Sequence, residues 1–103
     1  MTNIDVSIVV CTYNRAGMLA DALTSLASLQ MSGRRYEIVV VNNASTDDTS
    51  AAIQRVASAA AVDIREVLEP RQGIVFARNC GIRAARGPWI AFFDDDQIAD
   101  SAW

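Results

Sequence analysis

Three consecutive aspartates, Asp94, Asp95 and Asp96, follow the apolar run at residues 89–93 and are the side chains best suited to chemistry. If the strand geometry of that run continues, Asp94 and Asp96 lie on one face with Cα atoms roughly 6.5 to 7 Å apart. At an effective dielectric constant of about 20 their repulsion is on the order of 2 kcal/mol, which favours a bound cation or raised pKa values. Carboxylate oxygens suit Mg²⁺ or Mn²⁺. The alternative interpretation is a solvated acidic turn.

Other polar residues beside apolar runs are candidates for binding a planar or anionic ligand. Tyr13 could lay its ring against a base or sugar, or serve as an edge residue of the core. Asn42 and Asn43 could bind a base edge, although such residues more often bond to the local backbone. Arg78 and Asn79 fall near the start of a predicted helix, where backbone N–H groups and a guanidinium suit a phosphate. Arg78 could equally be a surface residue paired with a carboxylate.

The composition removes several kinds of chemistry. All nine basic residues of the 103-residue chain are Arg, with no Lys and no His. The chain therefore lacks a P-loop Lys, a Schiff-base amine, and the imidazole of a Ser-His-Asp triad or a zinc site. A net charge of -3 and a pI of about 4.7, without a basic cluster, argue against nucleic acid or an anionic membrane as partner. Cys11 and Cys80 are interpreted as small buried residues rather than a disulfide.

Hydrophobic periodicity predicts seven alternating elements in one domain. Apolar, β-branched runs predict strands at residues 4–11, 36–41, 63–68 and 89–93. Apolar residues at helical spacing predict helices at 16–30, 51–61 and 74–86, with Ser45 and Asp48 as a capping pair before the second helix. This βαβαβαβ order predicts an α/β fold, an open and mostly parallel sheet flanked by helices with the first strand central.

The polar segments CTYNR, NNASTDD and DDDQ each follow the carboxyl end of a predicted strand. In an open α/β sheet, ligands bind beyond these ends, where the strand order reverses. The candidate residues are therefore expected to converge at one edge of the sheet.

Taken together, VSIVVCTYNR, EIVVVNNASTDDT and GIVFARNCGIRAARGPWIAFFDDDQI resemble the donor-binding half of family 2 glycosyltransferases, which have the GT-A fold. The resemblance covers nearly the whole chain. It implies that residues 1–103 are the Rossmann-like, nucleotide-sugar-binding part of a glycosyltransferase domain that stops before the acceptor half.

The resemblance also implies which residues bind the nucleotide. Thr12 and Tyr13 match positions that contact the nucleobase, and Asn42 and Asn43 match a pair that usually includes an Asp reading the base ring. Asn42 stands where many members carry that Asp, which leaves open a weaker base contact or a nucleotide other than uridine.

Asp94 and Asp96 match the D-x-D motif of the family. Its carboxylates bind the ribose and the divalent metal, Mg²⁺ or Mn²⁺, that bridges the donor diphosphate, and Asp96 aligns with the metal-side position. Asp95, between them, is expected among the donor-binding residues. Arg78, with Asn79, and Gly81 match a helix segment that lines the donor site or packs tightly beneath it, and these two uses remain open.

The implied function is metal-assisted, inverting transfer of a hexosyl or related group from a nucleotide-diphosphate sugar to a hydroxyl of a glycan, lipid or other acceptor. The general base is expected beyond Trp103, so the 103-residue chain alone is expected to be inactive for transfer. The alternative is a non-catalytic nucleotide-binding or scaffold module. A phosphotransfer domain fits poorly because it needs a Lys.

The chain carries no basic n-region or apolar stretch of membrane-spanning length. Membrane association is therefore not indicated in this chain. The expected location is the cytoplasm, with the inner face of the membrane as an option.

Overall fold

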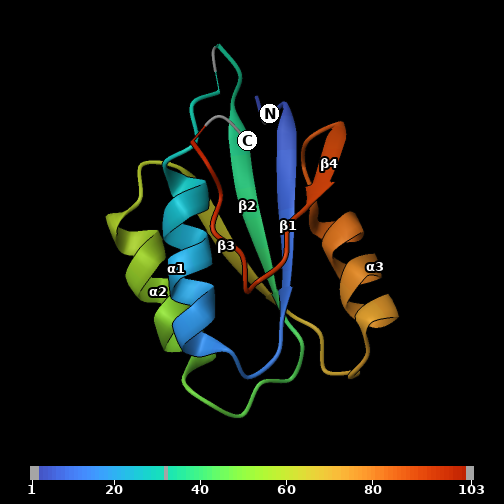
Figure 1. Cartoon of the computed structure of the whole chain (residues 1–103). Coiled ribbons are helices and arrows are strands. Elements are labelled where there is room, and N and C mark those ends of the chain that lie inside the picture. The colour runs from blue at the N-terminus through green and yellow to red at the C-terminus, as the bar shows by residue number, and fades with distance from the viewer. Residues whose placement is uncertain (1–2, 32, 102–103) are drawn as a thin grey trace.

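The computed structural model describes residues 3–31 and 33–101 and contains the seven alternating elements that the sequence predicts (Figure 1). In chain order they are β1 (Val6–Thr12), α1 (Ala16–Ala27), β2 (Tyr36–Asn42), α2 (Thr49–Ala59), β3 (Asp63–Leu68), α3 (Ile74–Ala84) and β4 (Trp89–Phe92). All strand pairs are parallel, so the predicted α/β fold with a parallel sheet is confirmed.

The sheet has the strand order β3-β2-β1-β4, which places β1 at an interior position as predicted. From β1 the chain steps outward to β2 and β3, then returns to the other side of β1 for β4. The strand order thus reverses between β1 and β4. A ligand crevice is expected at the carboxyl ends of these two strands.

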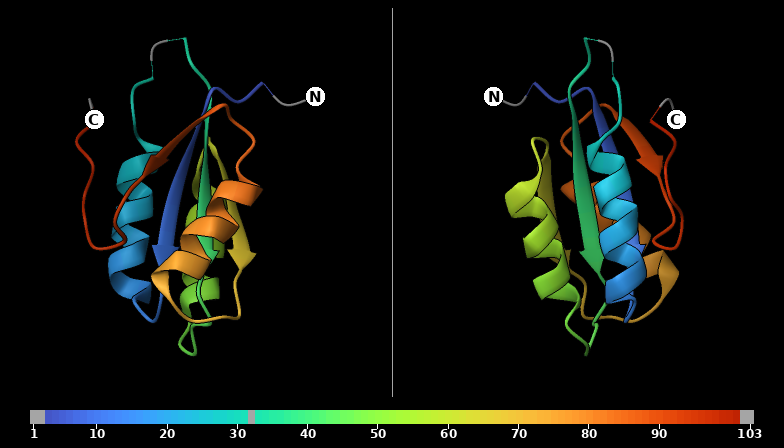
Figure 2. Two further views of the ribbon diagram at one scale, coloured as in Figure 1. Left: turned by 90° about the vertical axis from the view of Figure 1, so that its right-hand side faces the viewer. Right: turned by 60° about the vertical axis from the view of Figure 1, so that its left-hand side comes forward.

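Helices cover both faces of the sheet. Helices α1 and α2 lie on one face and α3 on the other, as the two views of Figure 2 show. Because strand residues alternate between faces, Ile8 and Val10 of β1 pack in the cluster with α1, whereas Val9 packs with α3. None of the helices in the described part of the chain is long and apolar enough to cross a membrane.

Strand β4 is shorter than its neighbour. It pairs with β1 only from Trp89 opposite Val6 to Phe92 opposite Val9, so Val10, Cys11 and Thr12 have no partner in β4. The Phe93 N–H adds one more bond to the Val9 carbonyl, at 3.1 Å, before the chain leaves the sheet. This divergence opens a gap beside the carboxyl end of β1.

The early end of β4 corrects one prediction. Asp94, Asp95 and Asp96 do not continue the strand, so strand alternation does not place Asp94 and Asp96 on one face. They form a turn in which the Gln97 N–H donates to the Asp94 carbonyl at 3.3 Å. We call residues 94–96 the acidic turn.

The predicted cap of the second helix is also wrong. Helix α2 begins at Thr49, where the Asp47 carboxylate accepts the Thr49 N–H at 3.0 Å. The Ser45 hydroxyl instead accepts the Asn14 N–H at 3.0 Å, so it joins two loops rather than capping a helix.

All three predicted helices are too long at their carboxyl ends, and the second, predicted at 51–61, lies at Thr49–Ala59. Helix α1 ends at Ala27, after which Ser28 and Leu29 make tighter i→i−3 bonds. Helix α3 ends at Ala84: the Ala85 N–H makes the last helical bond, to the Gly81 carbonyl, and the N–H groups of Arg86 and Gly87 bond instead to the side chains of Glu37 and Ser7.

Candidate functional site

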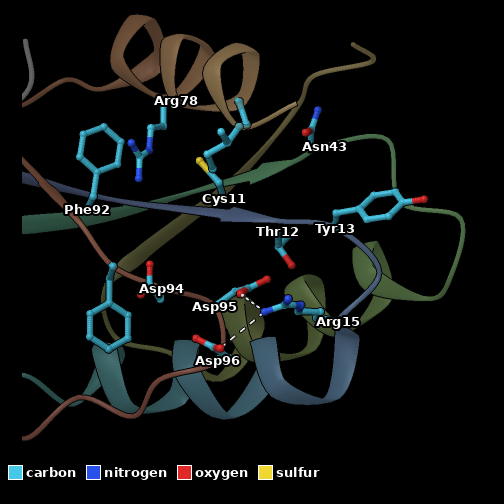
Figure 3. Close-up of a pocket in the computed structure, with 13 residues that line it drawn as sticks. Cys11, Thr12, Tyr13, Arg15, Asn43, Arg78, Phe92, Asp94, Asp95 and Asp96 are labelled. Carbon is cyan, nitrogen blue, oxygen red and sulfur yellow. Dashed lines mark hydrogen bonds and ion pairs between the residues drawn. The ribbon is translucent and has the colours of Figure 1, made fainter. Parts of the chain in front are cut away.

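A cavity of about 420 Å³ lies at the carboxyl ends of β1 and β4, where the strand order reverses (Figure 3). The loop after β1, the start of α3 and the acidic turn surround it. Its lining residues are Cys11, Thr12, Tyr13, Arg15, Asn43, Ile74, Ala77, Arg78, Phe92, Phe93, Asp94, Asp95 and Asp96. The structure therefore brings together Thr12, Tyr13, Asn43, Arg78 and the three aspartates, as the sequence predicts.

The α3 side of the cavity carries a cation. The Arg78 guanidinium lies 5.6 Å from the centroid of the Phe92 ring and forms no ion pair with a carboxylate in the described part of the chain. Burial raises the pKa of the nearby Cys11 thiol to about 11, although the Arg78 charge acts in the opposite direction. Cys11 is therefore a neutral thiol at physiological pH, and Arg78 is the group on this side suited to an anion.

The α1 side of the cavity carries the acidic turn. Asp94 and Asp96 are exposed, whereas Asp95 is buried. The Nη1 atom of Arg15 lies 3.2 Å from Oδ1 of Asp95 and 3.6 Å from Oδ2 of Asp96. Figure 3 shows Arg15 reaching from the start of α1 to both carboxylates. Negative charge thus gathers on one side of the cavity and a free guanidinium on the other.

Asn14 and Arg15, which sequence reasoning did not single out, join the loops of the site. Asn14 has a φ of 51°, and its Oδ1 accepts the N–H groups of Thr46 at 2.7 Å and Asp47 at 3.2 Å. The hydrogen bond from the Thr49 hydroxyl lowers the pKa of the Asp47 carboxyl group, so the Asp47 side chain is ionised at neutral pH. The sequence signal that could have identified Asn14 is its position two residues after a strand, because Asn tolerates a positive φ in such a turn.

The end of β1 lies at the cavity, which is lined by its last residue, Thr12, and by the next residue, Tyr13. Thr12 is 3% exposed, and its Oγ1 is the only buried side-chain polar atom in residues 3–31 and 33–101 without a hydrogen-bond partner. Tyr13 is 46% exposed, so about half of its side chain is open to solvent beside the cavity. An unpaired buried hydroxyl costs free energy unless a ligand or water completes it. An exposed aromatic face beside it is suited to a planar ligand.

Asn42 and Asn43 differ in their position relative to the cavity. Asn43 lines the cavity, but its Nδ2 donates to the carbonyls of Glu69 and Arg71, and its Oδ1 accepts the Gly73 N–H at 3.0 Å. The Asn43 amide thus holds the loop that leads into α3.

Asn42 does not line the cavity. It donates to Ser50 and Glu66, and its Oδ1 accepts the Ser45 N–H at 3.0 Å.

The helix segment around Arg78 serves two purposes. A Cβ atom on Gly81 would lie 2.4 Å from Cγ1 of Val9, so the absence of a side chain lets α3 approach β1 closely. Of the two uses left open for this segment, Gly81 packs beneath the site and Arg78 lines it. Asn79 is exposed and lies outside the cavity lining.

The donor set for a divalent metal is limited to the exposed carboxylates of Asp94 and Asp96. Among the described residues, no group of three or more acidic, Cys or His side chains is arranged to hold a metal by itself. Mg²⁺ is commonly bound by one or two carboxylates together with waters and substrate phosphates. The two exposed carboxylates fit a metal shared with a phosphate ligand and do not form a closed protein cage.

The fold and the crevice define an open α/β domain with a ligand-sized cavity at its topological switch point. The chain belongs to glycosyl transferase family 2, whose family model matches residues 7–103. The parallel sheet with helices on both faces is the GT-A arrangement of its structural neighbours.

Known proteins similar to this chain are glycosyltransferases or biosynthetic proteins. The succinoglycan biosynthesis protein ExoM of Rhizobium meliloti is 33% identical over 99 residues, which cover 95% of this chain and 32% of ExoM. The chain therefore spans about a third of the length of this relative.

Two solved structures superpose closely on the chain. S. aureus TarS 1-349 in complex with UDP has a TM-score of 0.85 at 25% identity, over 96% of this chain and 29% of that one. The mannosyltransferase PcManGT from Pyrobaculum calidifontis, in complex with GDP-Man and Mn²⁺, has a TM-score of 0.84 at 29% identity, over 95% and 29% of the two chains.

Proposed function

We propose that this chain is the donor-binding part of a glycosyltransferase that uses a nucleotide-diphosphate sugar with a divalent metal and inverts the sugar configuration. The observation that carries the proposal is the cavity at the switch point, lined by an exposed aromatic ring, an unpaired buried hydroxyl, a free guanidinium and exposed carboxylates. Two structural neighbours support it, since TarS 1-349 has been solved in complex with UDP and PcManGT in complex with GDP-Man and Mn²⁺.

The nucleoside is bound at the end of β1. The exposed ring of Tyr13 stacks on the base, and the Thr12 hydroxyl supplies a hydrogen bond that no protein group uses. Asn43 supports this end through the loop that it holds. Arg78, across the cavity, pairs with the diphosphate.

Asp94 and Asp96 bind the ribose and the metal, with Asp96 as the principal metal ligand. The metal, when bound, acts as a Lewis acid on the leaving diphosphate. A net charge of -3 gives the chain a field that repels a diphosphate, so a divalent counter-ion is needed beside the acidic turn.

Transfer requires residues outside this chain. In the proposal, the general base and the wall that binds a glycan, lipid or other hydroxyl acceptor come from the remaining length that the relatives possess. The 103-residue chain by itself binds donor and metal but does not transfer the sugar.

Calorimetry on the purified chain tests the proposal directly. UDP or GDP is expected to bind in the presence of Mn²⁺ and much more weakly with EDTA. Asp96→Ala is expected to abolish the metal-dependent part of the affinity. Asp21→Ala, which removes the same charge from an exposed position on α1, is the matched control and is expected to bind like the wild type.

Two outcomes would contradict separate parts of the proposal. Equal affinity with Mn²⁺ and with EDTA would remove the metal from the function. No binding of either nucleotide under both conditions would remove the nucleotide-sugar donor as well.

A further inference from the structure

The middle aspartate of the acidic turn differs from its two neighbours. The side chain of Asp95 is 11% exposed, whereas that of Asp96 is 49% exposed. Asp95 also makes the shorter contact with Arg15, at 3.2 Å against 3.6 Å for Asp96. In Figure 3 the Asp95 carboxylate and the Arg15 guanidinium point toward one another across the α1 side of the cavity. The three aspartates are therefore not equivalent: Arg15 contacts both Asp95 and Asp96, but its shorter contact is with Asp95, the more buried of the two.

Arg15 is held in place to make this contact. Its backbone carbonyl accepts the Leu19 N–H at 2.8 Å in the first turn of α1. The preceding residue, Asn14, is tied through its side chain to the backbone of Thr46 and Asp47 in the loop after β2. The guanidinium therefore projects from a backbone that is anchored on both sides.

In the part of the chain that the structure describes, few backbone hydrogen bonds hold the acidic turn to the rest of the fold. The backbone leaves the sheet after the Phe93 N–H bonds to Val9, and the Gln97 N–H bonds back only to Asp94, within the turn. The next link to the helices is the Ala99 N–H to the Ser25 hydroxyl at 2.8 Å. Between these points, the side-chain contact of Arg15 joins the turn to the β1–α1 loop.

We propose that Arg15 and Asp95 are positioning residues: their ion pair holds the acidic turn against the β1–α1 loop so that Asp94 and Asp96, but not Asp95, meet the ligand. The inference rests on the proposed function and assigns different roles to residues of the same site. Asp95 acts by neutralising Arg15 and fixing the backbone on either side of it. Asp94 and Asp96 keep their carboxylates exposed on the cavity.

A double-mutant cycle with Arg15→Gln and Asp95→Asn tests this pairing. Partners that orient a metal ligand typically change metal affinity by about 10- to 100-fold when removed, and each single variant is expected to weaken Mn²⁺-dependent UDP binding by such a factor. The double variant is expected to bind UDP as tightly as the weaker-binding of the two single variants, because both substitutions remove the same ion pair. Arg15→Lys, which keeps the charge, is expected to recover part of the loss. Arg55→Gln on the exposed face of α2 is the control for the lost charge.

Hydrogen exchange of the ligand-free chain gives a second readout that requires no ligand. Arg15→Gln and Asp95→Asn are both expected to speed exchange at residues 93–97 and to leave the amides of β2 unchanged. Arg15 has a half-exposed side chain, so Arg15→Gln is expected to remain folded.

Losses that multiply in the double variant would show that Asp95 touches the ligand independently of Arg15 and would overturn the inference. Unchanged exchange at residues 93–97 in both single variants would also overturn it. A wild-type chain that binds neither Mn²⁺ nor UDP would instead count against the proposed function, while the exchange result would still decide whether the pair holds the turn.

Discussion

Two buried hydroxyls on strand β1 face opposite edges of the sheet. Ser7, near the amino end, is fully buried; its hydroxyl donates to Oε2 of Glu37 at 2.7 Å and accepts the Gly87 N–H at 2.9 Å. Thr12, at the carboxyl end, is nearly as buried, and its Oγ1 has no hydrogen-bond partner among the residues that the structure describes. At the edge of the sheet formed by the amino ends of the strands, which we call the amino edge, the buried polar groups thus have hydrogen-bond partners within the protein. At the opposite edge, formed by the carboxyl ends of the strands and called the carboxyl edge, the buried Thr12 hydroxyl remains available for a hydrogen bond to a ligand.

The closed network at the amino edge centres on Glu37, a fully buried carboxylate. Its Oε1 accepts two bonds from the Arg65 guanidinium, at 2.9 and 3.1 Å, and its Oε2 accepts the Arg86 N–H at 2.8 Å. Burial alone raises the pKa of Glu37, but the bonds from Ser7, Arg86 and Arg65 outweigh burial and hold the pKa below its usual value. The network joins β1, β2 and β3 to the α3–β4 connection, so it contributes to stability.

The largest effect is expected from Glu37→Gln, which keeps the shape of the side chain and removes its charge. Breaking one partner of a buried ion pair typically costs about 3 kcal/mol, because the partly buried Arg65 loses its counter-ion. Urea denaturation is the measurement. Nucleotide binding by the folded fraction is expected to be unchanged, since Glu37 lies at the edge opposite the cavity.

The control at the same edge is Asp63→Asn. Asp63 pairs with Arg86 at 3.4 Å, but both side chains are about half exposed, so the change is expected to cost less than about 1 kcal/mol. Equal losses for the two variants would contradict a closed, buried network at this edge.

Acid is expected to weaken the same network. Because the pKa of Glu37 is lower in the folded chain than its unfolded value of about 4.3, the unfolded state binds more protons. The stabilisation is therefore complete above that unfolded value and is lost as the pH falls through the folded pKa. The difference in urea midpoint between the wild type and Glu37→Gln is therefore expected to be constant near neutral pH and to shrink as the pH falls below the unfolded pKa. A difference that does not shrink in acid would show that the Glu37 charge is not linked to folding.

The order of elements and the position of the crevice were predictable because both follow from local pattern. Apolar, β-branched runs predicted the four strands, and the polar segments after them predicted the edge of the sheet at which the cavity lies. Tyr13, Arg78 and the acidic turn were therefore placed correctly on the cavity. These predictions needed only the spacing of residues along the chain.

What sequence reasoning missed depends on pairing between distant segments. Strand β4 ends at Phe92 because the chain leaves β1 there, and the letters FFDDD do not show this departure. Asn42 and Asn43 look alike in the sequence, yet only Asn43 reaches the cavity. The contact between Arg15 and Asp95 joins residues 80 positions apart, so no local pattern contains it.

The first test of the carboxyl edge, where the cavity lies, is Tyr13→Ala. Removing an aromatic ring that stacks on a base is expected to weaken nucleotide binding by about 1 to 3 kcal/mol. The exposed position predicts little change in thermal stability. Tyr13→Phe keeps the ring and is expected to bind nearly as well as the wild type, with both affinities measured by calorimetry. Unchanged affinity together with a lower melting temperature for Tyr13→Ala would mean that the ring supports the fold instead.

The smallest and sharpest test exchanges the two hydroxyls of β1 for apolar groups. Ser7→Ala is expected to destabilise the chain by about 1 kcal/mol, because the buried Glu37 carboxylate and the Gly87 N–H each lose a partner. Thr12→Val is close to isosteric and removes a buried polar atom that has no partner, so it is expected to stabilise the ligand-free chain by a few tenths of a kcal/mol. The two variants therefore differ in sign although the residues share one strand. For nucleotide affinity the expected order is the reverse: the proposed function assigns the Thr12 hydroxyl to the ligand, so Thr12→Val is expected to weaken binding and Ser7→Ala is not. Destabilisation by Thr12→Val with unchanged nucleotide affinity would mean that the carboxyl edge is as closed as the amino edge.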